Sequence, residues 1–272
     1  MDKTARNSGA RHPAVAGMFY SNDPAQLRQD VGGLIAAAPS SGAIAVKAII
    51  APHAGYVYSG SIAAAAFAAV RGQSTGITRV IVVGPAHYVA LRGMAIPTVH
   101  AFETPLGRLP IDHVALAAIS DLPFVQFSDR PHAPEHALEV ELPFVQMLIG
   151  NCDLVPIVVG DAEPAEVAQV LDRLWDGVST LIVISSDLSH YHDYDTARRL
   201  DGETAALIEA GEWAQLDAKR ACGYLPIAGL LVETTRRGLA ARRLALCNSG
   251  DSAGDRARVV GYGAWAFGAQ SG

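Results

Sequence analysis

Residues 181–190 read LIVISSDLSH, and this stretch indicates the fold of the whole chain. A short run of apolar, β-branched residues is typical of a strand that is buried on both faces. Here the run passes directly into serine, aspartate and histidine. Residues 46–53 and 80–87 have the same form, since VKAII leads to APH and VIVV leads to GPAH. The chain therefore repeats a buried strand that ends in polar side chains.

Helical patterns alternate with these strands. Continuous apolar strands alternating with helices predict an α/β domain whose central sheet, mainly parallel or mixed, is flanked by helices. Residues 94–150 are less regular. The expected strands are residues 46–50, 80–83, 154–159, 181–185, 242–246 and 259–267, and the expected helices are residues 24–38, 60–70, 164–175, 196–210 and 226–237.

Composition and charge exclude several classes of protein. The sequence has 272 residues, of which 50% are hydrophobic and 18% charged, so wholesale disorder is excluded. No apolar run reaches the roughly 18–20 residues of a membrane span, and the N-terminus lacks the apolar centre of a signal peptide. A net charge of −6 without a dense basic run argues against nucleic acid as a partner. We therefore expect a cytoplasmic protein that binds neither membrane nor nucleic acid.

Domain organisation and cysteine content are simple. No linker rich in Gly, Ser or Pro and no repeat divides the chain, so residues 11–272 are expected to form a single domain after a flexible tail of residues 1–10. The three cysteines, Cys152, Cys222 and Cys247, are far apart and have no CxxC spacing. They fit neither a disulfide framework nor a cysteine-rich zinc site, and a reducing compartment suits them.

Polar residues collect at the carboxyl ends of the expected strands. His53 and His87 each follow one strand, Asp187 and His190 follow a third, and Cys247 follows a fourth at residues 243–246. In open α/β sheets the ligand crevice lies outside these strand ends. Imidazole suits iron, copper and zinc, and a thiolate adds a softer ligand. The predicted metal ligands are therefore His53, His87 and Cys247.

Two neighbouring residues have open roles. His190 has a side chain suited to acid or base catalysis near neutral pH. Asp187, three residues earlier, could orient His190 or take a metal position. The plainer interpretation is that the histidines of this region cap strand ends and bond to the backbone.

A second group lies at residues 134–139, which read PEHALE. His136 and Glu139 at i, i+3 would share a helix face, as metal-binding pairs do, but this spacing is short and common. The favoured interpretation places Glu135 or His136 in the same pocket and leaves Glu139 and Glu141 in solvent. Pro143 would end or bend that helix early.

Two familiar motifs occur in the sequence without the neighbouring elements that their functions require. Residues 250–254 match the GxSxG nucleophile elbow, which needs a helix after it and a catalytic histidine later in the chain, but no histidine follows residue 192. Residues 261–266 match the GxGxxA dinucleotide pattern, but too few residues follow for a βαβ unit. A Gly-rich turn and a closely packed strand explain these two segments.

The blocks that carry these residues resemble the Memo family, also called AmmeMemoRadiSam system protein B. Each block alone is weak, but together they are specific and extend over nearly the whole chain. The blocks are RHPAVAGMFY at residues 11–20, APHAGY at 51–56, GPAH at 84–87, EHALEV at 135–140, SSDLSH at 185–190, NSGD at 248–251 and VVGY at 259–262.

The resemblance implies a fold related to class III extradiol ring-cleavage dioxygenases, which are non-haem Fe(II) enzymes. It places His53 and His87 on the metal ligands and Cys247 where animal members use a cysteine as the third ligand. Asp187 and His190 match the remaining pocket residues. Fe(II) is the expected metal, with copper or zinc as alternatives. Microbial members are linked to a radical-SAM protein and an AMMECR-type protein, which are expected partners.

Three functions remain as hypotheses. The first is a dioxygenase-like metal oxidoreductase acting on a small-molecule substrate, with His190 transferring protons and Tyr56 or Glu135 contacting the substrate. The second is a metal-stabilised module that binds a peptide or partner protein without catalysis. The third is a zinc-dependent hydrolase that uses the same pocket.

Overall fold

The expected apolar strands pair into one mixed sheet. The computed structural model describes residues 9–39 and 45–269. The sheet contains, in spatial order, β10 (His190–His192), β12 (Val259–Gly268), β2 (Val46–Ala51), β9 (Thr180–Ser185), β3 (Arg79–Pro85), β8 (Asp153–Val159), β4 (Met94–Ile96) and β7 (Val125–Phe127), with β11 (Ala240–Asn248) paired to β12. Strands β2, β9, β3 and β8 are parallel, whereas β12 is antiparallel to β2 and β4 is antiparallel to β8. The expected mainly parallel or mixed sheet is confirmed.

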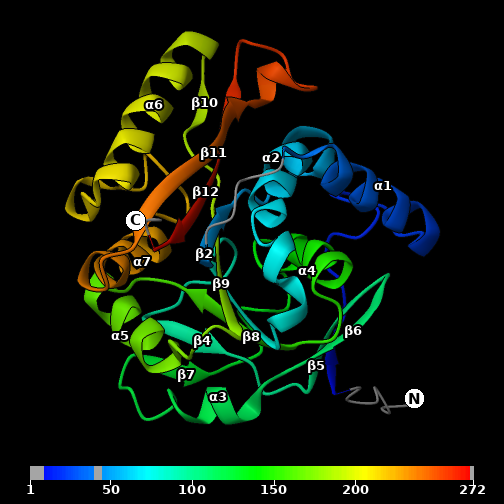
Figure 1. Ribbon diagram of the computed structural model, residues 1–272, viewed down its shortest axis with the longest axis vertical. Coiled ribbons are helices and arrows are strands. Elements are labelled where there is room, and N and C mark those ends of the chain that lie inside the picture. Colours follow the sequence, from blue (N-terminus) through cyan, green and yellow to red (C-terminus); the bar gives the residue numbers. More distant parts are fainter. Residues whose placement is uncertain (1–8, 40–44, 270–272) are drawn as a thin grey trace.

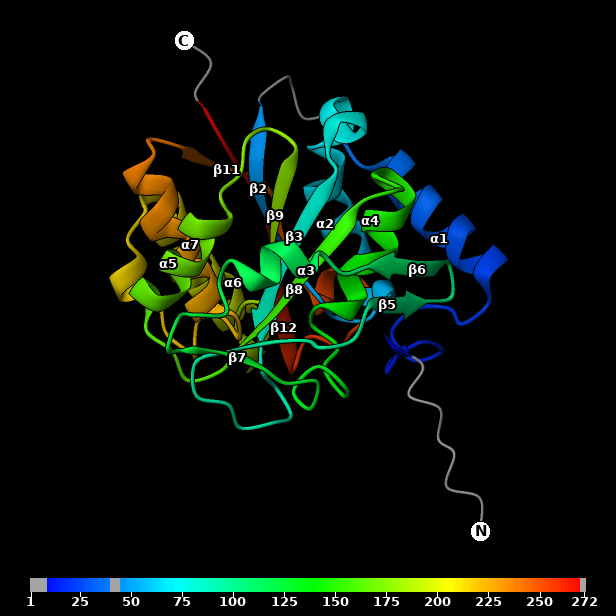
Figure 2. The same cartoon turned by 90° about the horizontal axis from the view of Figure 1, so that it is seen from below.

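Helices cover both faces of this sheet (Figures 1 and 2). One face carries α1 (Pro24–Ala37), α2 (Tyr56–Ala68) and α4 (Leu142–Leu148), and the other carries α5 (Pro164–Leu174), α6 (Tyr194–Ala210) and α7 (Tyr224–Arg236). Because both faces are covered, strand residues such as Ile49, Val82 and Ile182 are fully buried. No helix in the described parts of the chain combines the length and the apolar character that crossing a membrane requires.

The less regular middle of the chain holds small elements. A separate three-stranded sheet contains β1, β5 and β6, with β5 parallel to β1 and antiparallel to β6. The bounds are β1 (Ala10–Arg11), β5 (Ala101–Thr104), β6 (Gly107–Pro110) and α3 (His113–Ala117), and the short 3-10 turns are η1 (Arg71–Gly76), η2 (Glu139–Glu141), η3 (Trp213–Gln215) and η4 (Ser249–Asp251).

The structure differs from two of the expectations about local structure. Residues 1–8 of the expected tail lie outside the described residues, and Ala10 pairs with Ala101 in β1. Pro143 stands in the first turn of α4 and so begins a helix there, where it was expected to end one. This follows because proline has no amide hydrogen to lose in a first turn, and its fixed φ angle suits that position.

Glu139, expected in solvent, is fully buried and ties the N-terminal segment to the middle of the chain. Its carboxylate accepts hydrogen bonds from Arg11 Nη1 (2.5 Å), from the backbone N–H groups of Ala14 (2.7 Å) and Val15 (3.0 Å), and from the Tyr20 hydroxyl (2.6 Å). A buried carboxylate is tolerated where a cation and several donors surround it. The solvent interpretation failed because the sequence does not show these distant partners.

We predict that Glu139→Gln lowers the free energy of unfolding by about 3–5 kcal/mol, because it leaves the buried Arg11 guanidinium without its counter-charge. Urea unfolding measures this change. The control is Glu203→Gln, which breaks an exposed ion pair with Arg199 and is expected to lose less than about 1 kcal/mol. Equal losses in the two variants would contradict the role given to Glu139.

Candidate metal centre

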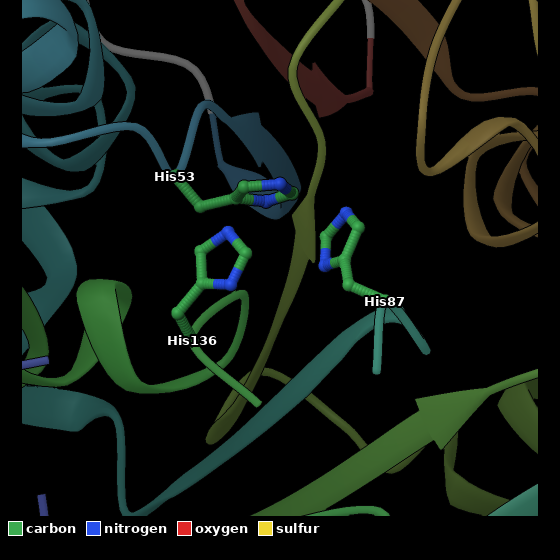
Figure 3. A group of neighbouring side chains, drawn as sticks. All are labelled: His53, His87 and His136. Atoms are coloured by element: carbon green, nitrogen blue, oxygen red, sulfur yellow. The ribbon is translucent and has the colours of Figure 1, made fainter. Parts of the chain in front are cut away.

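The strand order brings three of the predicted residues to one place. Strand β9 lies between β2 and β3 and is parallel to both. Their carboxyl ends therefore meet at one edge, where His53 follows β2, Asp187 follows β9 and His87 follows β3. His136, in the loop before η2, joins them from the side (Figure 3).

Within the described residues, His53, His87 and His136 form a group whose possible ligand atoms all lie within 4.8 Å of one another. The ring centroids are 5.2 Å apart for His53 and His87, 5.3 Å for His53 and His136, and 4.7 Å for His87 and His136. Figure 3 shows the three rings converging on one space. Three imidazoles in this arrangement have the chemistry of a transition-metal site.

His53 is held from behind by the end of β9. Its backbone N–H donates to Asp187 Oδ1 (2.9 Å), and its ring Nδ1 lies 2.8 Å from Ser185 Oγ. Burial, followed by the nearby histidines, lowers the pKa of His53 well below its ordinary value. The ring is therefore neutral at pH 7, with Nε2 left to face the centre.

His87 is held by Glu135. The Glu135 carboxylate accepts from the backbone N–H of His87 (2.7 Å) and lies 2.8 Å from its ring Nδ1. Burial acts to raise the pKa of Glu135, but the hydrogen bonds and charge of His87 outweigh it and lower that pKa. A carboxylate on the far nitrogen of a histidine is the usual support for a metal ligand. Glu135 was expected to contact substrate, but the structure places it behind His87.

His136 completes the group, although it does not stand on the helix expected for it. Its ring Nδ1 lies 3.1 Å from the Tyr88 hydroxyl and 3.4 Å from Glu135 Oε1. Burial lowers its pKa to about 4. The remaining nitrogen, Nε2, is the one free to face the centre.

The structure brings Cys222, and not Cys247, to the histidines. Cys222 Sγ lies 3.3 Å from His53 Nε2, and it accepts a hydrogen bond from the Asp187 backbone N–H (3.3 Å). Cys247 is at the end of β11, opposite Tyr262, and does not belong to the group of possible ligands. The expected position of Cys247 is corrected for a topological reason: strand β12 lies between β11 and β2.

A signal for Cys222 was present in the residue that follows it. A Cβ atom on Gly223 would lie 2.7 Å from Ser186 Cβ and 2.8 Å from the Ser185 carbonyl oxygen. Only glycine lets the start of α7 come so close to the end of β9. The Cys-Gly pair before an apolar helix therefore indicated a close approach, but nothing in the sequence named its partner.

Asp187 and His190 lie beside the three histidines. Burial raises the pKa of Asp187 to about 7, although the hydrogen bond from the His53 backbone N–H acts to lower it. His190 Nδ1 lies 2.8 Å from the Leu188 carbonyl oxygen, which can only accept, so Nδ1 carries the proton and Nε2 keeps its lone pair. Burial has the opposite effect on His190 and lowers its pKa. Asp187 can therefore exchange a proton near neutral pH, and His190 is neutral there with a lone pair to accept one.

Tyr56, which was predicted to contact the substrate, faces the core. Its hydroxyl donates to the Val140 carbonyl oxygen (2.8 Å), and its ring packs against Tyr20 and Phe144. It lines neither of the two cavities beside the histidines. The expectation that Tyr56 contacts substrate is therefore not supported by its position.

A cavity of about 950 Å³ opens onto the centre. A second cavity of about 470 Å³ reaches the same place from the other side and shares part of the lining. Five residues line both cavities, namely Phe19, His136, Asp187, His190 and Tyr191. A space of this size admits a small molecule or a short peptide segment.

We predict that His136 in the metal-free protein stays neutral down to about pH 4, as does the buried His132. The unfolded chain binds these protons near pH 6.5, so the contribution of both histidines to stability falls as the pH drops from 6.5 toward 4. NMR titration of the ring protons measures each midpoint, with the urea-unfolded protein as the control. A midpoint for His136 near 6.5 in the folded protein would contradict its burial.

Comparisons with known proteins agree with this architecture. A solved structure, an uncharacterized protein of Escherichia coli K12, aligns with a TM-score of 0.50 at 13% identity, over 82% of this chain and all of that one. That likeness concerns the fold alone, and it agrees with the single α/β domain and mixed central sheet expected from the sequence.

Relatives found by sequence are more similar to this chain than that structure is. A MEMO1 family protein of Methanothermobacter thermautotrophicus is 32% identical over 93% of this chain and 98% of its own length. Another, from Aeropyrum pernix, is 34% identical over 93% and 97%. The family model described as Memo-like protein matches residues 11–266. The chain therefore belongs to the Memo-like protein family.

Proposed function

We propose that this protein is a metal-dependent, dioxygenase-like oxidoreductase that acts on a small substrate in the 950 Å³ cavity. The observation that supports the proposal is the convergence of His53, His87 and His136 at the wall of that cavity. Each of the three has its other nitrogen engaged by a neighbouring group. Such partners fix the tautomer and the direction of a ligand.

The donor set fits Fe(II) and also admits copper or zinc. Neutral imidazole suits all three metals, and geometry and availability decide between them. His53, His87 and His136 would hold the metal, and Cys222 or Asp187 would offer an anionic donor beside them. We propose iron because a mixed set of histidines and one anionic group is typical of non-haem iron oxygenases. Bound Fe(II) would supply the redox chemistry with dioxygen.

The chain itself would move the protons. His190 lines the cavity with a lone pair on Nε2 and is suited to take a proton from a substrate hydroxyl. Asp187, whose pKa burial raises to about 7, can exist in either protonation state at neutral pH. Pairs of groups with shifted pKa values in one cavity are typical of acid and base catalysis.

We predict near-stoichiometric metal in protein purified anaerobically without a metal-chelating tag. His53→Ala, His87→Ala and His136→Ala are each expected to lose it, because each removes one converging nitrogen. Elemental mass spectrometry measures the content, and Cys247→Ala is the matched control that keeps its metal. Metal retained in all three histidine variants would contradict the proposed centre. Tight zinc with ester or amide turnover would replace the redox proposal with hydrolysis.

We predict that the iron-loaded protein consumes dioxygen with at least one member of a panel of catechols and reductants. His190→Gln is expected to keep its iron and to slow this uptake by about 10²–10⁴-fold, the usual contribution of a general acid or base. An oxygen electrode measures the rate. No uptake with any substrate by fully loaded protein would overturn the redox function.

The rim of the cavities favours a second candidate. Met18 is 72% exposed, Tyr191 64% and Tyr88 57%. Met18 lines the smaller cavity, Tyr88 the larger one, and Tyr191 both. Exposed apolar side chains around a hollow are typical of protein-binding surfaces. The centre would then stabilise a module that binds a peptide or an AMMECR-type or radical-SAM partner. Partner binding that survives in His53→Ala/His87→Ala would favour this module over the enzyme.

A further inference from the structure

Ser185, at the end of β9, has three hydrogen-bonding partners for its hydroxyl, which has only one proton to donate. Its Oγ lies 2.6 Å from the Ala137 carbonyl oxygen, 2.8 Å from His53 Nδ1 and 2.9 Å from Glu141 Oε1. A serine hydroxyl has one proton to donate and two lone pairs to accept with. The carbonyl of Ala137 can only accept. Ser185 therefore donates its proton there, at the shortest of the three distances.

This assignment fixes the other two partners. Both lone pairs of Ser185 Oγ must then accept, so His53 donates from Nδ1 and Glu141 donates from Oε1. A carboxyl group can donate only when it is protonated. Glu141 is therefore a neutral acid in the metal-free protein, and His53 is held as the tautomer whose Nε2 lone pair faces His87 and His136.

The surroundings of Glu141 agree with a neutral acid. Its side chain is fully buried, and its second oxygen, Oε2, has no hydrogen-bond partner among the described residues. The titratable groups that face it are Asp187, which repels a negative charge, and the Tyr56 phenol. Burial raises the pKa of Glu141 well above its usual range, and the repulsion of Asp187 acts in the same direction.

We propose that Glu141 is a second supporting carboxyl group of the metal centre, which reaches His53 through Ser185 and ionises when a divalent cation binds. The proposal rests on the function proposed above. Glu135 already supports His87 directly as a carboxylate. Glu141 is separated from its histidine by the Ser185 hydroxyl, and no described residue gives it the counter-charge that Arg11 gives to Glu139. A cation on His53 would supply that counter-charge, and Glu141 would release its proton to solvent.

This role makes Glu141 a positioning residue, since it lines neither cavity beside the histidines. Once ionised, Glu141 would accept the Ser185 proton, and Ser185 would still accept from His53 Nδ1. The chain from carboxylate through hydroxyl to imidazole keeps the same ligand tautomer and adds a negative charge behind it. Supporting partners of metal ligands contribute about 10–100-fold to metal affinity.

The test is isothermal titration of the metal-free protein with Zn²⁺ at neutral pH in two buffers of different ionisation enthalpy, which yields the protons released per ion. We expect Glu141→Gln to release about one proton fewer than the natural chain and to bind Zn²⁺ about 10-fold more weakly. The amide of Gln donates to Ser185 as the neutral acid does, so the fold is preserved. Asp187→Asn is the control, because Asp187 is a second buried carboxyl group beside the histidines and is able to release a proton. Equal release from Glu141→Gln and the natural chain would overturn the proposal.

A second measurement does not require metal binding. Infrared spectra of the metal-free protein should contain the carbonyl band of a protonated carboxyl group that disappears in Glu141→Gln. Nitrogen-15 spectra should show His53 protonated at Nδ1, like His190, and unlike His132, which bonds to a backbone carbonyl through Nε2. Failure to bind Zn²⁺ with both signals present would refute the proposed metal function alone. Absence of the carboxyl band would refute the neutral Glu141.

Discussion

The parallel pairing of β9 with β2 on one side and β3 on the other is the constraint on which the site depends. It aligns three strand ends, so that segments more than 30 residues apart in sequence deliver His53, His87 and Asp187 to one point. The end of β9 is also in direct contact with its neighbours, because Ser185 touches the His53 ring and Asp187 accepts its backbone N–H. The sheet therefore fixes both the places and the orientations of these side chains.

A second constraint acts on the segment EHALEVE at residues 135–141, where three buried carboxyl groups have three different environments. Glu139 is paired with Arg11 and anchors the segment to the N-terminal strand. Glu135 is paired with His87 at the centre. Glu141 has no cation beside it in the part of the chain that the structure describes, and it meets a serine hydroxyl instead. The charge state of each follows from its partner, and together they hold His136 against the other histidines.

The sequence alone predicted the fold well because apolar strands buried on both faces are local patterns. The strand predicted at residues 181–185 is observed as Thr180–Ser185, and the helix predicted at 196–210 as Tyr194–Ala210. The strand ends also indicated His53, His87 and Asp187, since each follows its strand directly. The cysteine beside them could not be predicted in the same way. Both Cys222 and Cys247 stand near element ends, and Gly223 indicates a close approach at Cys222 without naming its partner. The position of β12 between β11 and β2, which sets Cys247 apart, cannot be read from the sequence.

The measurement that tests this account most directly is an anomalous difference map at the iron absorption edge, from crystals loaded anaerobically with Fe(II). The account predicts one strong peak within coordination distance of the inward nitrogens of His53, His87 and His136. In the ordinary electron density map, a side-chain atom of Cys222 or Asp187 at coordination distance from that peak would identify the anionic ligand. A map without a peak between the three histidines, or with iron bound at another place, would contradict the metal centre and leave these residues as the lining of a binding cavity.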